Sequence, residues 1–265
     1  MPLSIVKLTP LRRGCIALAL AGIFLWLGGC ATTGDESEQW SAEELYKEAH
    51  DALEANDFEA AIKHFETLEA KYPFGPYAEQ VQLDTAYAYY RFEEPDSAIA
   101  AADRFIKLHP RHPKVDYAYY LRGLAAGSKK KHPLNFLMPQ DPSERDPGSA
   151  QRAFDYFKEL VTRFPDSIYA PDAVERMKKL RLDLAYHEVH VAQYYLKRHA
   201  FVAAANRATY ILETFPQTPP THEALEILVK AYEGLGMDDL AADSRRVLEL
   251  NFPAKPSAPD SDADS

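Results

Sequence analysis

Cysteine and long apolar runs are both scarce in this chain of 265 residues. Its two cysteines, Cys15 and Cys30, lie in the first 30 residues. A disulfide framework is therefore excluded for the rest of the chain, whose stability must come from packing. The apolar run from Gly14 to Leu27 has 14 residues, whereas a transmembrane helix needs about 20.

Positive charge is also in short supply. The chain has 30 Lys and Arg residues against 40 Asp and Glu residues, giving a formal net charge of −10. Because nucleic-acid phosphates require a basic surface, this balance excludes nucleic acid as a partner. The sequence also has no Gly-x-Ser-x-Gly elbow, no P-loop and no Gly-x-Gly-x-x-Gly, so it favours a non-enzymatic protein without a cofactor.

The N-terminal segment has the three regions of a bacterial lipoprotein signal. Lys7, Arg12 and Arg13 precede the apolar run, and the run ends in Leu27-Gly28-Gly29-Cys30. The two glycines admit an extended backbone to a protease, and the thiol of Cys30 is the nucleophile that can carry a lipid such as palmitate. We therefore predict a signal peptide over residues 1–29 and lipidation of Cys30.

The predicted lipid also sets the destination of the protein. Ala31 follows the lipidated residue, in place of the aspartate typical of inner-membrane retention in enterobacterial lipoproteins. The outer membrane is therefore favoured, with the chain on its periplasmic face. Removal of residues 1–29 takes away three positive charges and leaves 236 residues with a net charge of −13, so the lipid rather than charge is expected to provide the anchor.

Both ends of the mature chain are predicted to lack regular structure. Residues 30–40 are polar and read as a flexible tether that spans at most roughly 35 Å. Ser41 to Glu44 has the pattern of a capping box and predicts the start of the first helix. Residues 254–265 alternate Pro, Ser, Ala and Asp, a composition typical of disorder.

Between these ends an alanine precedes a proline by twelve residues five times. The pairs are Ala61 and Pro73, Ala98 and Pro110, Ala153 and Pro165, Ala204 and Pro216, and Ala241 and Pro253. An aromatic residue or histidine stands before each proline. Small alanines allow two antiparallel helices to approach, and each proline ends the second helix. The pattern predicts an all-α, right-handed α-solenoid of about five tetratricopeptide-like helical hairpins.

Unequal spacing between the closing prolines indicates two insertions. Residues 127–148 are rich in Lys, Pro and Gly, which predicts a long loop inside the third hairpin. Residues 167–199 have no strong helix breaker after Pro171, which predicts one unusually long helix or two nearly continuous ones. We therefore expect an N-terminal block of three repeats over 41–165 and a C-terminal block of two repeats over 166–253.

Two groups of residues suggest binding. His187 and His190 are three apart, so they share a helix face and could hold a weak transition-metal site, although a zinc-protease helix needs histidines four apart. Tyr87 to Arg91 and Tyr117 to Arg122 place aromatic and basic side chains on the first helices of neighbouring repeats. Those helices are expected to line a concave surface, where tyrosine and arginine serve as interface anchors. The alternative is that the tyrosines belong to the core and the arginines are solvated.

Several longer strings resemble the BamD (ComL) family of outer-membrane β-barrel assembly lipoproteins. These strings are Tyr72-Pro73-Phe74-Gly75-Pro76-Tyr77, Gln80 to Asp84, Asp103 to Ile106, Arg122 to Leu124, Ser143 to Pro147, and Val191 to Arg207 with gaps. The resemblance spans roughly residues 40–216 and is weaker in the last repeat. The segment with Lys129 to Lys131 and Leu134 to Met138 is longer and more basic than the family pattern.

The resemblance implies a non-enzymatic scaffold of the outer-membrane β-barrel assembly (BAM) complex. Expected partners are the periplasmic domains of the barrel-forming subunit, accessory lipoproteins and unfolded outer-membrane proteins. It assigns Arg198, Asn206 and Arg207 to the assembly-subunit side. It assigns Tyr77, Tyr90, Arg91 and Arg122 to the substrate or accessory side. Two other functions stay open from the residues: a tetratricopeptide lipoprotein for pilus assembly or cell-wall synthesis, and a metal-dependent hydrolase that uses His187 and His190.

Overall fold

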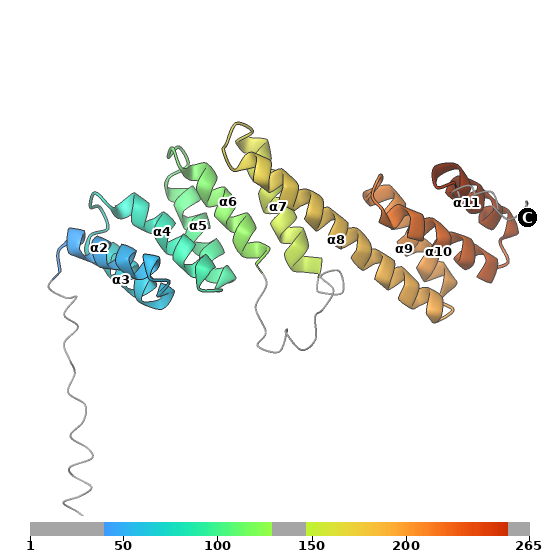
Figure 1. The fold of residues 1–265 in the computed structure, drawn as a ribbon, viewed down its shortest axis with the longest axis horizontal. Coiled ribbons are helices and arrows are strands. Elements are labelled where there is room, and N and C mark those ends of the chain that lie inside the picture. The colour runs from blue at the N-terminus through green and yellow to red at the C-terminus, as the bar shows by residue number, and fades with distance from the viewer. Residues whose placement is uncertain (1–39, 129–146, 254–265) are drawn as a thin grey trace, which may run out of the picture.

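The computed structural model describes residues 40–128 and 147–253, which form ten helices and no strand (Figure 1). In chain order these helices are α2 (Ala42–Glu54), α3 (Phe58–Lys71), α4 (Ala78–Arg91), α5 (Pro95–Leu108), α6 (Val115–Ala126), α7 (Pro147–Arg163), α8 (Ala170–Lys197), α9 (Phe201–Thr214), α10 (Pro220–Gly234) and α11 (Asp238–Asn251). The predicted signal peptide, Cys30, most of the tether, residues 129–146 of the insertion and the tail over 254–265 lie outside the described residues.

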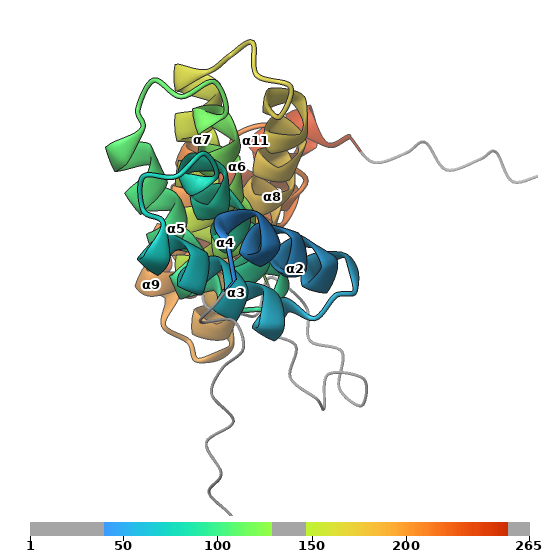
Figure 2. The same ribbon diagram turned by 90° about the vertical axis from the view of Figure 1, so that its left-hand side faces the viewer.

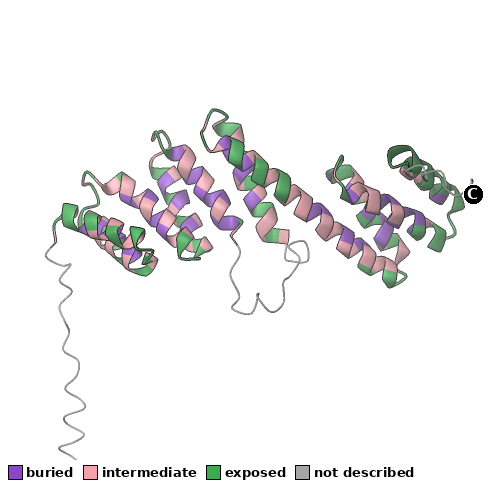
Figure 3. Cartoon of the chain, viewed as in Figure 1, coloured by how far each residue is buried: buried purple, intermediate pink, exposed green. Residues whose placement is uncertain are grey.

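The helices pair into five hairpins that stack along an elongated array (Figures 1 and 2). Each helix packs on the next one along the chain, and the first helices of neighbouring hairpins also meet, α4 on α6 and α8 on α10. The all-α solenoid of five hairpins predicted from the alanine and proline spacing is therefore confirmed. Buried residues lie on the helix faces turned toward neighbouring helices (Figure 3).

The alanines of the repeat pattern lie inside the stack of helices. All five are buried: Ala61, Ala98, Ala153, Ala204 and Ala241. Phe65 and Phe157, four residues after the first and third of these alanines, are among the largest fully buried or nearly fully buried side chains. The residue before each repeat proline is a helix cap or follows directly on the helix, as expected if the proline ends the second helix.

Four of the turns inside hairpins share one backbone geometry. In each turn a residue with positive φ follows the helix cap: Asn56, Glu93, His199 and Gly236. In the first, the Asp57 N–H donates to the Ala52 carbonyl at 2.9 Å and the Asn56 N–H donates to the Leu53 carbonyl at 3.1 Å. The same pair of bonds recurs in the other three turns. These are Schellman motifs, which satisfy the last carbonyls of the first helix.

The helix boundaries confirm two sequence predictions and correct a third. Ser41 and Glu44 form the expected capping box at the start of α2, and α8 is a single helix of 28 residues. The insertion was expected to extend to Gly148, but α7 begins at Pro147. Proline is preorganised for the first turn of a helix because its fixed φ is helical and its missing N–H has no helical partner there.

Helix α8 contributes to three hydrophobic cores, and in the smallest of them Leu184 and Ala185, near the middle of the helix, are buried with Phe215. Ala173 in its N-terminal half is buried in the core that also contains Phe105 and Phe157. Val189 and Ala192 in its C-terminal half are buried in the core shared with α9 and α10. One helix therefore joins the packing of the third hairpin to that of the fifth.

Candidate partner-binding surfaces

The end of α8 and the outer face of α9 carry exposed aromatic, aliphatic and basic side chains. Residues four apart share a helix face, so Val202, Asn206 and Tyr210 form a row along α9. All three are exposed. We call this surface the α8–α9 patch; it consists of Tyr194, Arg198, Val202, Asn206, Arg207 and Tyr210, all of them exposed. It brings together the three residues that the resemblance assigns to the assembly-subunit side.

Neighbouring aromatic and acidic groups position the basic residues of the patch. Arg198 is the C-cap of α8, and its guanidinium carbon lies 5.2 Å from the ring centroid of Tyr194. Nη1 of Arg207 donates a hydrogen bond to Oε2 of Glu188 on α8 at 3.0 Å, which fixes α9 against α8. Beside this ion pair is a hollow of about 380 Å³, lined by Tyr195, Ala203, Asn206, Arg207 and Tyr210.

The residues expected on the substrate or accessory side do not form one surface. Tyr77 caps the start of α4 and stacks on Tyr46, with ring centroids 4.4 Å apart. Arg91 is at the other end of α4. Because a helix rises about 1.5 Å per residue, the two ends of this 14-residue helix are roughly 20 Å apart. Tyr90, near Arg91, lines a separate hollow of about 260 Å³ with residues of α6, α7 and α8.

Arg91 is exposed but tied to the first hairpin. Its Nη1 donates to the Tyr87 hydroxyl at 2.6 Å and its Nη2 donates to Oδ1 of Asn56 at 3.0 Å. The guanidinium carbon also lies 4.7 Å from the ring centroid of Phe58. These contacts connect the turns of two successive hairpins, so the side chain has a structural role in addition to any binding role.

Arg122 is not available on a concave surface, contrary to expectation. It is 8% exposed, and its two terminal nitrogens form ion pairs with Asp103 at 2.7 Å and Glu159 at 2.5 Å. The rings of Tyr119 and Tyr156 flank the guanidinium, at 4.7 and 4.5 Å. The helix periodicity placed Arg122 among aromatic residues, but the charge does not face solvent because carboxylates on α5 and α7 neutralise it within the stack.

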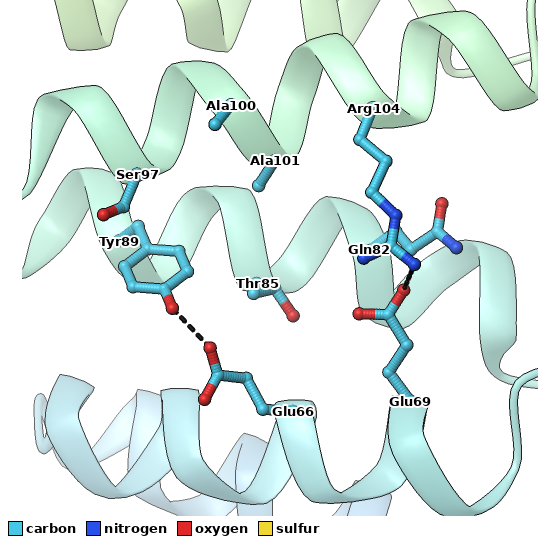
Figure 4. Close-up of a pocket in the computed structure, with 9 residues that line it drawn as sticks. All are labelled: Glu66, Glu69, Gln82, Thr85, Tyr89, Ser97, Ala100, Ala101 and Arg104. Carbon is cyan, nitrogen blue, oxygen red and sulfur yellow. Dashed lines mark hydrogen bonds and ion pairs between the residues drawn. The ribbon is translucent and has the colours of Figure 1, made fainter.

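A polar hollow that the sequence patterns did not single out lies between α3, α4 and α5 (Figure 4). Its volume is about 340 Å³. The Tyr89 hydroxyl donates to Oε1 of Glu66 on one side, and on the other Arg104 forms an ion pair with Glu69 at 2.9 Å (Figure 4). The hydrogen bond to Glu66, together with partial burial and the nearby carboxylates, raises the pKa of Tyr89 to about 12.

Hydrogen-bond acceptors line part of this hollow. Oε1 of Gln82 is buried and accepts no hydrogen bond from the described residues. Glu66 and Glu69 add carboxylate oxygens. The signal for this surface is helical spacing: Gln82, Thr85 and Tyr89 are three or four residues apart, so they share one face of α4. That face could have been found in the sequence, but its partner residues on α3 and α5 depend on how the hairpins stack.

The histidine pair of α8 does not extend into a metal site within the described residues. His187 and His190 are both partly buried and have interaction partners. Residues 40–128 and 147–253 contain no group of three or more His, Cys, Asp or Glu side chains arranged to hold a metal ion. None of the helices in those two ranges is long and apolar enough to cross a membrane.

Comparison with known proteins identifies the family. The profile of the family YfiO, described as outer membrane lipoprotein, matches residues 38–248. An outer membrane protein assembly factor BamD of Neisseria meningitidis is 49% identical over 245 residues, which cover 90% of this chain and 92% of that protein. The chain belongs to the BamD family.

More distant BamD proteins align over the same extent of the chain. The BamD of Xylella fastidiosa is 39% identical and aligns over 89% of this chain and 82% of its own length. The BamD of Vibrio cholerae is 37% identical, with 90% and 96% covered. Among solved structures, the TPR2AB domain in the pHSP90 complex of yeast Sti1 is 14% identical over 79% of this chain and 83% of that chain, with a TM-score of 0.38. So loose a structural match carries no functional argument.

Proposed function

We propose that this BamD-family chain is a lipid-anchored, non-enzymatic scaffold of outer-membrane β-barrel assembly. It lies on the periplasmic face of the outer membrane and binds the barrel-forming subunit, accessory lipoproteins and unfolded outer-membrane proteins. The observation that carries this proposal is the family match over residues 38–248, which includes nine of the ten described helices completely and most of the tenth. The relatives named outer membrane protein assembly factor BamD favour barrel assembly over pilus assembly or cell-wall synthesis.

The α8–α9 patch supports a docking role for the C-terminal hairpins. Tyrosine and arginine are enriched among the residues that dominate binding energy, because they combine a large rigid surface with hydrogen-bonding groups. Arg198 and Arg207 could each form a two-pronged bond with a partner carboxylate. The patch lies on two helices that share one hydrophobic core and are also linked by the Arg207 to Glu188 ion pair, so little order needs to be gained on binding.

The hollow between α3, α4 and α5 supports a substrate role for the N-terminal hairpins. An extended, unfolded segment presents backbone N–H donors, and the hollow presents the acceptor oxygens of Glu66, Glu69 and Gln82. A buried acceptor without a donor is costly, so a peptide that supplies one gains free energy on binding. We propose that this hollow, rather than Arg122, receives unfolded outer-membrane protein segments.

Depletion of the protein in its native bacterium tests the assembly role. We expect folded barrel proteins in the outer membrane to fall and periplasmic chaperones to rise. A pull-down from solubilised outer membranes should recover the barrel-forming subunit. Normal barrel levels on depletion would contradict the proposal, and recovery of pilus or cell-wall proteins without a barrel subunit would favour the alternative.

Arg198→Glu tests the docking surface. Reversal of this exposed charge within the proposed interface is expected to cost about 2 kcal/mol or more of binding free energy, measured against the purified barrel-forming subunit. Arg246→Glu on α11, also exposed and outside the patch, is the matched control and should bind like the unchanged protein. Circular dichroism melting should be unaltered in both; a large loss of stability in Arg198→Glu alone would assign Arg198 a structural role instead.

A further inference from the structure

The array of hairpins has two edges with different compositions. The turns within the first, second, fourth and fifth hairpins form one edge, which we call the turn edge (54–58, 91–96, 197–201 and 234–239); the turn of the third hairpin lies mostly outside the described residues and is not counted in it. The loops between hairpins and the end of α11 form the other, which runs along the top of Figure 1. We call it the loop edge (71–78, 107–115, 163–171, 214–222 and 250–253).

Exposed apolar side chains concentrate on the loop edge. Six large hydrophobic residues are more than half exposed in the described part of the chain, and four of them are on this edge. These four are Phe74 (99% exposed), Ile168 (82%), Leu250 (76%) and Leu108 (53%). The other two, Tyr194 and Val202, belong to the α8–α9 patch. The four come from four different hairpins, so exposure of an apolar residue is a repeated property of this edge rather than one local accident.

The charge of the loop edge is opposite to that of the chain as a whole. Its five segments contain five basic residues, Lys71, Lys107, Arg111, Lys114 and Arg163, and one acidic residue, Asp166. The four turn-edge segments contain seven acidic and three basic residues. A chain with an excess of acid therefore presents a basic and apolar border on one side. This combination matches an anionic phospholipid surface, whose headgroups attract Lys and Arg and whose acyl boundary accepts apolar side chains.

The chain enters the solenoid at the loop edge. Helix α2 is the first helix of its hairpin, so it begins at this edge. The Tyr72 hydroxyl donates to the Trp40 carbonyl at 3.2 Å, which places the start of the described chain beside the loop that carries Phe74. The ten residues from Ala31 to Trp40 reach at most roughly 35 Å, so a lipid on Cys30 would hold this edge close to the bilayer. The turn edge lies roughly 20 Å from the loop edge, the length of a 14-residue helix.

We propose that the loop edge is a membrane-contacting surface. Phe74 and Ile168 enter the interfacial region of the bilayer, and Lys107 and Arg111 bind the phosphates of anionic phospholipids. This inference rests on the proposed lipid anchor, which brings the solenoid to the bilayer. The flexible tether alone would leave the orientation of the solenoid free, and contact of the loop edge with lipid fixes it. It turns the acidic turn edge, which includes Arg198 at the end of α8, toward the periplasm.

Single cysteine labels test the orientation. Both native cysteines lie in the first 30 residues, so after processing and lipidation a new cysteine is the one free thiol. An environment-sensitive fluorophore is attached to Phe74→Cys, Ile168→Cys and, as the control, Met237→Cys, an exposed residue of the turn edge. The lipidated proteins are placed in vesicles of phosphatidylethanolamine and phosphatidylglycerol. We expect blue-shifted emission and quenching by doxyl-labelled lipid at Phe74 and Ile168, and neither at Met237.

A second preparation separates this inference from the lipidation of Cys30. A Cys30→Ser protein with an N-terminal histidine tag is bound to the same vesicles through a nickel-chelating lipid, which attaches it at the same end. Labels at Phe74 and Ile168 that stay in water in this preparation would overturn the inference, whatever the state of Cys30. A blue shift that occurs only when a partner protein is added would also overturn it and assign the edge to a protein interface.

Neutralisation of single basic residues gives a quantitative test of the proposed lipid binding. For the untagged Cys30→Ser protein, Lys107→Gln or Arg111→Gln should each weaken sedimentation with the anionic vesicles about fivefold, since a basic residue near such a surface contributes on the order of a fivefold change in affinity. Lys230→Gln, an exposed residue of α10 away from the loop edge, is the matched control and should have no effect. Equal binding by all three variants and the unchanged protein would contradict a lipid surface as the ligand of these cations.

Discussion

Two glycines allow an aromatic ring to lie directly against a first helix. A Cβ atom added at Gly123 on α6 would lie 2.4 Å from Cε1 of Phe157 on α7. A Cβ added at Gly234 on α10 would lie 2.5 Å from Cζ of Phe201 on α9. Separations this short are far below van der Waals contact, and Phe157 is almost fully buried. Glycine at these positions therefore serves close packing rather than backbone freedom.

Gly123→Ala is predicted to destabilise the protein. Overpacking of a well-packed core costs about 1–3 kcal/mol, and this outweighs the gain of about 1 kcal/mol from replacing glycine by alanine inside a helix. We expect a net loss of about 1 kcal/mol in the free energy of unfolding, measured by urea denaturation. Gly127→Ala is the control, because its Cβ would meet neighbouring atoms only at ordinary distances of 3.4 Å or more. A Gly123→Ala protein as stable as the control would show that the Phe157 ring moves aside at little cost.

Tyr89 is predicted to make stability fall at alkaline pH. Its folded pKa is raised to about 12, whereas an unfolded tyrosine ionises near about 10. The stabilisation is complete below the unfolded pKa and is lost as pH rises toward the folded pKa, because only the unfolded state releases the proton in that window. Urea denaturation at pH values of about 8 and about 11 should show a larger loss for the unchanged protein than for Tyr89→Phe. An equal loss in both proteins would show that Tyr89 does not contribute.

At the scale of single residues, the sequence predicted packing better than charge placement. Alanines such as Ala61 and Ala153 are buried as their spacing required, because helix periodicity alone determines which face they occupy. The same reasoning was wrong for Arg122. Its position on α6 follows from periodicity, but its burial depends on Asp103 and Glu159, which belong to other helices. Neither carboxylate has a fixed sequence spacing from the arginine, so only the stacked structure shows the cluster.

At the scale of elements, the four Schellman turns share one backbone geometry. The energetic cost of the positive φ in that geometry differs among the four residues that adopt it. Gly236 adopts positive φ at little cost, whereas Glu93 and His199 have side chains that crowd the left-handed conformation. The repeat pattern predicted a helical hairpin around each of these turns, but it did not show which residue takes the left-handed conformation. Only at Gly236 and, more weakly, at Asn56 does the residue type itself point to it.

Glu93→Gly is predicted to stabilise the second hairpin. Removal of the side chain relieves the steric strain of a left-handed φ of 64°. Glycine also makes the unfolded chain more flexible, and after this cost is subtracted the free energy of unfolding should rise by about 1 kcal/mol. Glu94→Gly, at the next position, is the matched control. Its φ is −104°, so glycine relieves nothing there and should lower stability. Thermal melting of the two variants would separate these outcomes, and a loss of stability in both would contradict the strain at Glu93.

At the scale of the whole molecule, α8 decides how the two predicted blocks behave. Its ends are buried in different cores, one shared with α7 and the other with α9 and α10. In a stack where each hairpin contacts only its neighbours, unfolding spreads only as far as the interfaces between them carry it. The length of α8 was predicted because the sequence lacks a breaker after Pro171. Its shared burial was not, since it depends on which face each half of the helix turns to its neighbours.

Lys179→Pro is predicted to uncouple the two ends of the molecule. Lys179 is exposed near the middle of α8, so the change removes little packing, but proline inside a helix removes a hydrogen bond and clashes with the preceding turn at a cost of about 3 kcal/mol. Lys179→Ala is the control and should leave stability within about 0.5 kcal/mol. In the proline variant, hydrogen exchange monitored by mass spectrometry should rise in α8 and α9 to α11 while α2 to α5 stay protected. The two regions would then melt in separate steps. If protection fell equally from α2 to α11, the five hairpins would form one cooperative unit, and the division into an N-terminal and a C-terminal block would be wrong.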